Sequence, residues 1–143
     1  ACDNDDDYMP PNQDIITALK QLYPDVQDIE WSQKGVYYVA DCWVNGSELD
    51  VWFDANANWI MTEMEIFREQ LPAAVNTAYE ESGYGDWVID NLTKLTFPHK
   101  SEEFVFEVQR GAQERALYYS AYGGLLLEKD ITDADDTHWP DVE

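Results

Sequence analysis

The chain has 143 residues, with 30 Asp or Glu against eight Lys or Arg and a formal charge of −22. This length fits one domain or two small fused halves. The charge argues strongly against nucleic-acid binding, because contacts to phosphate need basic groups. Basic proteins and cations remain electrostatically allowed partners. No stretch of the sequence is long and apolar enough to span a membrane.

Residues 1–11 are predicted to form an acidic tether. Ala1-Cys2, followed by an Asp-rich run, resembles the processed start of a bacterial lipoprotein, in which the lipid is attached to the cysteine. We therefore predict lipidation at Cys2, a removed signal peptide, and a location in the periplasm or at the outer membrane and cell surface. The alternative is a disordered acidic N-terminus that contains an incidental cysteine.

The first half reads as a helix followed by four strands. Ile15, Ile16, Leu19 and Leu22 define one apolar helix face over residues 12–23, and Pro24 ends the helix. Short runs rich in aromatic and β-branched residues follow, separated by turn signals of which Asn45-Gly46 is the strongest. The predicted strands are 26–31, 36–44, 48–54 and 59–66.

The second half repeats this order. Pro72 fits the first turn of a helix that begins near Leu71 and ends at Gly83. The predicted strands are 86–97, 102–110, 114–121 and 125–131. Residues 133–143 read as an acidic coil.

The two halves also share residues at fixed offsets. Tyr23 and Trp31 recur 56 positions later, whereas Phe53 matches Tyr119 at an offset of 66. We assign the difference of about ten residues to a longer hairpin through residues 97–100. The prediction is an α+β fold of two tandem α-β-β-β-β repeats, 12–67 and 68–132. They form one antiparallel sheet with both helices on one face and the other face open.

Strand alternation places a mixture of aromatic rings and carboxylates on the open face. We predict this face to be the partner-binding site, because Trp and Tyr are frequent interface anchors. The candidate residues are Tyr37, Trp43, Trp52, Trp59 and Tyr118. The alternative is that these rings pack on one another, or are covered, and only stabilise the sheet.

No catalytic motif is present, so we predict a protein that is not an enzyme and has no cofactor and no metal site. The run from Asp54 to Glu65 partly matches an EF-hand loop. Trp59 replaces the required Gly, and the flanks read as strands, so a plain hairpin turn is favoured. His99 and His138 lie far apart in the sequence and suggest no shared site.

The repeated unit resembles the PepSY-like family of secreted Bacteroidetes proteins, described as β-lactamase-inhibitor-like. The resemblance covers residues 12–131 and is carried by Leu-Tyr-Pro at 22–24, by Trp31 and by the hairpin at 51–59. It implies one curved antiparallel sheet, as in β-lactamase inhibitory protein, and an extracytoplasmic binding or inhibitory role. It implies no particular target and no contact residue.

These observations predict a monomer that binds a protein or peptide through the open face, with inhibition of a secreted peptidase or β-lactamase as one form of that role. A carbohydrate-binding surface module that uses the same Trp and Tyr rings is the alternative. Weak cation binding by the acidic ends is a further alternative.

Overall fold

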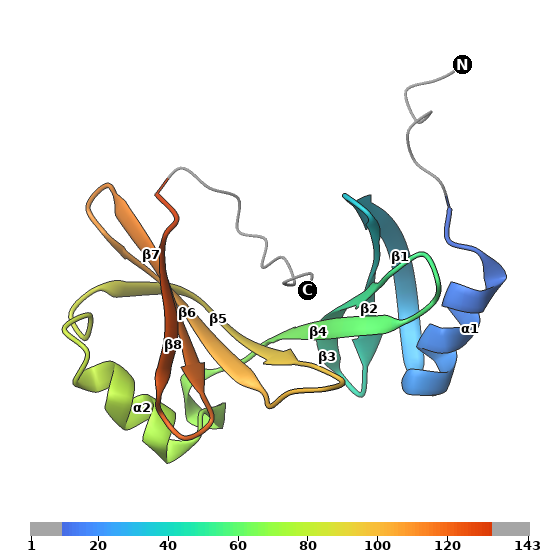
Figure 1. Cartoon of the computed structure of the whole chain (residues 1–143). Coiled ribbons are helices and arrows are strands. Elements are labelled where there is room, and N and C mark those ends of the chain that lie inside the picture. The colour runs from blue at the N-terminus through green and yellow to red at the C-terminus, as the bar shows by residue number, and fades with distance from the viewer. Residues whose placement is uncertain (1–9, 133–143) are drawn as a thin grey trace. The chain divides into compact units, whose positions relative to one another are not determined.

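The computed structural model describes residues 10–132, so Cys2, His138 and the predicted tail 133–143 lie outside the described residues. The described part has a mostly-sheet α+β fold in which eight strands follow the sequence order β1 to β8 (Figure 1). Two compact units divide the chain between Met64 and Glu65. Neither helix is long and apolar enough, within the described residues, to cross a bilayer.

Unit 1 contains one helix and four strands, each strand antiparallel to the next. Its elements are α1 (Gln13–Leu22), β1 (Val26–Lys34), β2 (Tyr37–Val44), β3 (Ser47–Phe53) and β4 (Trp59–Glu65). The Asn12 side chain caps α1 by accepting a 3.0 Å hydrogen bond from the Ile15 N–H. Such a cap satisfies a backbone donor that has no partner inside the helix.

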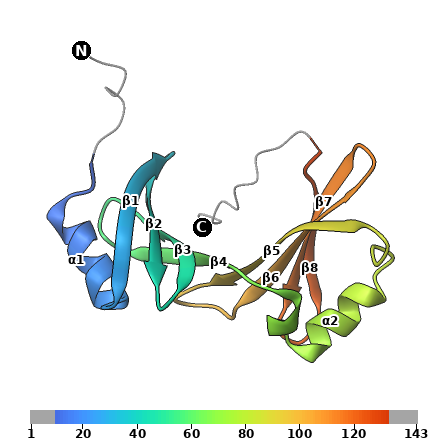
Figure 2. The ribbon, with the colours of Figure 1, turned by 180° about the vertical axis from the view of Figure 1, so that it is seen from behind.

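The core of unit 1 lies between α1 and one face of its strands. Figure 2 shows α1 beside β1 from behind. Ile15 and Leu19, both fully buried, contact a cluster on β2 and β3. The strand members of this cluster are Ala40, Cys42, Leu49, Val51 and Phe53. They alternate along each strand, so the residues between them point to the face opposite α1.

Unit 2 repeats the order of one α-helix and four antiparallel strands. Its elements are a 3₁₀ turn, η2 (Arg68–Gln70), then α2 (Ala73–Glu80), β5 (Val88–Thr96), β6 (Glu103–Arg110), β7 (Gln113–Ser120) and β8 (Leu125–Asp130). Tyr79 of α2 stacks on Phe106 at 4.3 Å between ring centroids, and Phe106 meets Tyr119 edge-on at 5.6 Å. Stacked and edge-on rings add to the apolar burial that holds α2 on the strands.

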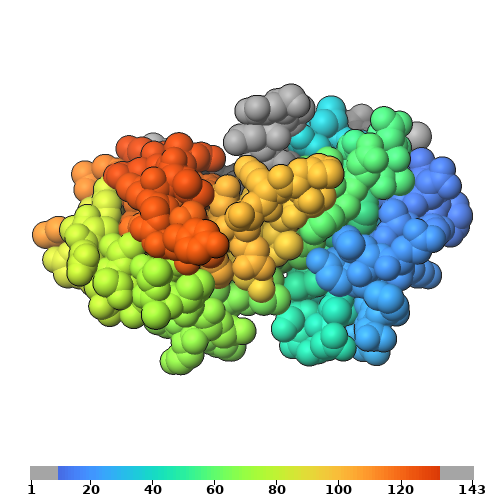
Figure 3. Space-filling model, turned by 60° about the horizontal axis from the view of Figure 1, so that its bottom comes forward, coloured from blue at the N-terminus to red at the C-terminus, as the bar shows by residue number. Residues whose placement is uncertain are grey.

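The turn between β7 and β8 packs tightly against α2. Gly123 has a φ of +89°, and a Cβ atom built there would lie 2.7 Å from the Ala74 carbonyl oxygen. Figure 3 shows β8 exposed on the surface beside α2. Leu125, Leu126 and Leu127 are 51%, 54% and 44% exposed.

The predicted helices and strands are confirmed to within about two residues at almost every boundary. A β-bulge interrupts the pairing of β3 with β4 at Trp52/Phe53, and another interrupts β7 with β8 at Tyr118/Tyr119. The two bulges lie 66 residues apart, which agrees with the predicted offset of 66. The duplication itself stays a prediction.

Candidate functional site

The face of unit 1 opposite α1 carries aligned polar residues and one exposed ring. Residues paired across antiparallel strands point to the same side of the sheet. Glu30 of β1 pairs with Asp41 of β2, which pairs with Asp50 of β3. The adjacent row pairs Trp43 with Glu48. We call Glu30, Asp41, Trp43, Glu48 and Asp50 the Trp43 face.

Trp43 is 42% exposed although it lies inside a strand of the sheet. Of the five predicted site residues, Trp43 is exposed, Trp59 is half-buried and the other three are buried. Beside it, burial raises the pKa of the Asp50 carboxyl, the charge of Asp41 raises it further, and Lys34 lowers it. The Trp43 face is therefore an indole framed by carboxylates that repel one another.

Trp52 and Tyr37 lie on the same side of the strands as Trp43, as strand alternation predicted, but they are buried. Trp52 is fully buried and Tyr37 is 6% exposed. The Trp52 indole N–H donates a 2.6 Å hydrogen bond to Glu63, and Tyr37 meets the Trp52 ring edge-on at 5.6 Å. Lys34 places its ammonium 5.7 Å from the centroid of the Trp52 ring. The expectation that these two rings are open to solvent is wrong.

Trp59 lies on the side of the strands that faces α1, which corrects its predicted place on the open face. The bulge shifts the register so that Trp59 pairs with Phe53, and Trp59 packs against the α1-side core. Its indole N–H donates to the Thr62 hydroxyl at 3.0 Å, and that hydroxyl also bonds the Tyr23 hydroxyl at 2.9 Å. One extra residue in the strand reverses the side to which the following side chains point.

Tyr118 belongs to unit 2, where it is 7% exposed. It pairs with Val105 and Leu127, and the Lys129 ammonium lies 5.1 Å from the centroid of its ring. It lies on the side opposite Phe106 and Tyr119, as alternation predicted. The structure therefore does not offer Tyr118 as an exposed ring.

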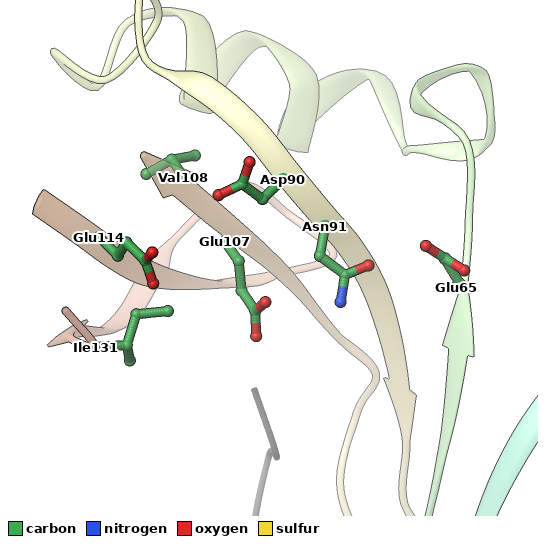
Figure 4. Close-up of a pocket in the computed structure, with 7 residues that line it drawn as sticks. All are labelled: Glu65, Asp90, Asn91, Glu107, Val108, Glu114 and Ile131. Carbon is green, nitrogen blue, oxygen red and sulfur yellow. The ribbon is translucent and has the colours of Figure 1, made fainter. Parts of the chain in front are cut away.

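Unit 2 contains an acidic cavity of about 340 Å³ that the sequence interpretation did not identify. Figure 4 shows its lining residues as sticks: Glu65, Asp90, Asn91, Glu107, Val108, Glu114 and Ile131. Glu107 is only 6% exposed, and it pairs across the strands with Asn91 and Ala116. Alternation did place Glu107 on the outer face, but no local signal indicated its burial. The lining is suited to a cationic group and contains no nucleophile paired with a base.

The run that partly matches an EF-hand forms the hairpin turn between β3 and β4, as favoured from the sequence. The Asp54 carboxylate accepts backbone hydrogen bonds of 2.9 Å from Asn56 and Asn58 and a 3.1 Å bond from the Asn58 amide. Burial raises the pKa of Asp54, but these hydrogen bonds outweigh it and lower the pKa overall. No group of three or more potential metal ligands is found within residues 10–132.

The described residues 10–132 form an α+β fold dominated by sheet, and several of its strands carry aromatic rings. The family model described as "Putative beta-lactamase-inhibitor-like, PepSY-like" matches residues 36–127. This chain belongs to the PepSY-like family, which confirms the resemblance found in its sequence.

Solved structures from Bacteroides species share the fold. A BLIP-like protein from Bacteroides fragilis is 55% identical, with a TM-score of 0.91 over 98% of this chain and 100% of that chain. A chain from Bacteroides eggerthii, described among "putative periplasmic proteins", is 30% identical with a TM-score of 0.84 over 90% and 94%. A DUF2874 family protein from Bacteroides ovatus is 29% identical with a TM-score of 0.85 over 90% and 93%. Comparison with curated protein sequences gives no match.

Proposed function

We propose that this chain is a non-catalytic extracytoplasmic protein that binds a protein partner through the Trp43 face. The observation that carries the proposal is an indole, 42% exposed, within a strand and on the side of the sheet that α1 does not cover. Tryptophan is the residue type most enriched among interface residues that dominate binding energy. The surrounding carboxylates add a polar rim and favour a partner of opposite charge.

Two comparisons support this role and location. The family is described as inhibitor-like, and a relative with 30% identity is described among "putative periplasmic proteins". The structure gives less support to the carbohydrate-binding alternative. Stacking on a sugar needs an exposed ring face, and Tyr37, Trp52 and Tyr118 are all buried.

The test begins by identifying the partner at this surface. A photo-crosslinking amino acid at position 43 should trap the partner in envelope fractions, and mass spectrometry would identify it. Position 122 is the matched control, because Tyr122 is an exposed ring at 89% in a turn of unit 2.

Affinity for the purified partner then decides the matter. We expect Trp43→Ala to weaken binding about 30-fold, equivalent to about 2 kcal/mol for a central aromatic anchor. We expect Tyr122→Ala to change it less than twofold. Unchanged affinity for Trp43→Ala, measured by titration calorimetry, would refute the proposed site.

Inhibition of a secreted hydrolase is the second candidate, favoured by the description of the family. Residual activity of secreted peptidases and β-lactamases should fall as the chain is added at micromolar concentration. The inhibition constant should rise for Trp43→Ala if the Trp43 face contacts the enzyme. The absence of inhibition across the panel would remove this candidate and leave simple partner binding.

A further inference from the structure

Unit 1 surrounds one of its tryptophans with groups of both charges. The indole N–H of Trp52 bonds a carboxylate, Glu63, while the ammonium of Lys34 lies over the ring at 5.7 Å from its centroid. A cation over the face of an indole is attracted by the ring quadrupole, and a nearby carboxylate neutralises that cation. Both charged groups that contact Trp52 therefore belong to this chain.

The charged residues that flank Trp43 in the strand pairing are carboxylates. Glu48 lies directly opposite it on β3, and Asp41 is two residues away on the same side of β2. Within residues 10–132 no cation is found over the Trp43 ring, and the Lys34 ammonium is engaged with Trp52. Between residues 10 and 64 the chain has nine Asp or Glu and only two Lys, so unit 1 itself has few cations to supply.

The arrangement of carboxylates around Trp43 lowers the stability of the folded chain. Asp41 and Asp50 are direct cross-strand partners, and like charges in that position are destabilising. Burial, followed by the charge of Asp41, raises the pKa of Asp50, and Lys34 only partly offsets this rise. Groups that lower stability are often retained where function needs them.

We propose that the partner supplies the missing cation, as an arginine whose guanidinium stacks on Trp43 and pairs with the adjacent carboxylates. This inference rests on the proposed function and specifies the chemistry of its partner. Arginine fits better than lysine, because a planar guanidinium can stack on an indole and bond a carboxylate bidentately at the same time. The partner segment is a basic one with arginines at alternate positions.

The spacing of the Trp43 face suits such a segment. Neighbouring strands lie about 4.8 Å apart, so the row Glu30, Asp41 and Asp50 spans roughly 10 Å. Alternate side chains of an extended segment are about 6.8 Å apart. Two or three arginines laid across β1, β2 and β3 can therefore each reach a carboxylate with their long side chains.

The probes are an acetylated and amidated heptapeptide, Gly-Arg-Ala-Arg-Ala-Arg-Gly, and its citrulline counterpart, which has the same shape without charge. Binding to the full chain is followed by amide shifts in NMR spectra at low salt. We expect the arginine peptide to shift the amides of β1 to β3 and the Trp43 indole, and the citrulline peptide to bind at least tenfold more weakly.

Two double variants with the same change in net charge separate this site from general attraction to an acidic protein. Asp41→Asn with Asp50→Asn should weaken the arginine peptide at least fivefold. The same variant should melt roughly 1–4 °C higher, because a repulsive pair is removed. Glu69→Gln with Glu81→Gln, at exposed positions of unit 2, should change binding less than twofold.

Equal weakening by both double variants, equal binding of the citrulline peptide, or no binding of the arginine peptide at millimolar concentration would each overturn the inference. The identified partner distinguishes this failure from failure of the proposed function. If Trp43→Ala abolishes partner binding and Asp41→Asn with Asp50→Asn leaves it intact, binding through the Trp43 face is supported and the proposed arginine contact is refuted. If neither variant changes partner binding, both proposals fail.

Discussion

The contact between the β7–β8 turn and α2 can be tested with a single methyl group. In Gly123→Ala the new Cβ would lie 2.7 Å from the Ala74 carbonyl oxygen and 3.4 Å from the Ala78 Cβ. The first contact is with backbone and cannot be relieved by a change of rotamer. Either the turn or α2 must move.

The control is Gly46→Ala in the β2–β3 turn of unit 1. Gly46 has a φ of +85°, close to the +89° of Gly123, but a Cβ atom placed on Gly46 would have nothing within 4 Å of it. Both variants incur about 1–2 kcal/mol for placing a side chain in the left-handed region. Gly123→Ala alone adds an overpacking term of about 1–3 kcal/mol.

Thermal unfolding followed by circular dichroism measures the difference. At this chain length 1 kcal/mol corresponds to about 4 °C in Tm, so Gly123→Ala should melt about 4–12 °C below Gly46→Ala. Equal Tm values for the two variants would show that the turn does not pack on α2 as described.

Two further outcomes follow from polar and ionisable groups of unit 1. Asp54→Ala should lower the free energy of unfolding by about 1 kcal/mol at pH 7, because it removes the bonds to Asn56 and Asn58. Since these bonds lower the pKa of Asp54, their stabilisation is present above its usual value of 3.8 and lost as the pH falls through the lowered pKa. Denaturant titrations should show that the difference in free energy of unfolding between Asp54→Ala and wild type disappears as the pH falls through the lowered pKa of Asp54. A difference that stays constant with pH would contradict the role assigned to Asp54. Burial, followed by nearby carboxylate charges, raises the pKa of the Cys42 thiol to about 11 from 9.0. The Cys2→Ser variant leaves Cys42 as the one thiol. At pH 8 a thiol reagent should react with Cys42 about 100-fold more slowly in the native chain than in the unfolded chain, because the thiolate is the reactive form. Equal rates would show that Cys42 is accessible.

Local chemistry was enough to predict the elements of the fold. Asn45-Gly46 occupies the turn between β2 and β3, with positive φ at both residues, as a type I′ turn requires. Pro72, predicted near the start of the second helix, immediately precedes α2. Each of these signals depends on a few neighbouring residues, so the sequence alone contains it.

The buried positions of the two helices match at a different offset from the aromatic residues used in the sequence comparison. Tyr23 follows α1, whereas Tyr79, its match at an offset of 56, lies inside α2. The buried pair of α1, Ile15 and Leu19, corresponds instead to Val75 and Tyr79 at an offset of 60. The connection between β5 and β6 therefore contains only part of the ten extra residues, because matching aromatic letters is a weaker guide than matching buried positions.

The site was harder to predict than the fold, because exposure depends on what packs against a residue. Alternation correctly placed Trp43 and Trp52 on one side of the strands, yet Trp52 is fully buried and Trp43 is 42% exposed. Trp59 was misplaced because a bulge is set by pairing between strands and has no fixed sequence signature. The carboxylates of the acidic cavity come together from separate strands in the same way.

The bulge of β3 with β4 also helps to fix the register of this hairpin. A hairpin with uniform alternation can slip by two residues and still present its apolar side chains to the core. Here the irregular step lies between Trp52 and Phe53, which point to opposite sides of the strands. A slip by two residues would move the irregular step away from these rings and lose the pairing of Trp59 with Phe53. Each unit therefore has one favoured register for its last hairpin, with the β7–β8 bulge at Tyr118 and Tyr119 having the same effect in unit 2.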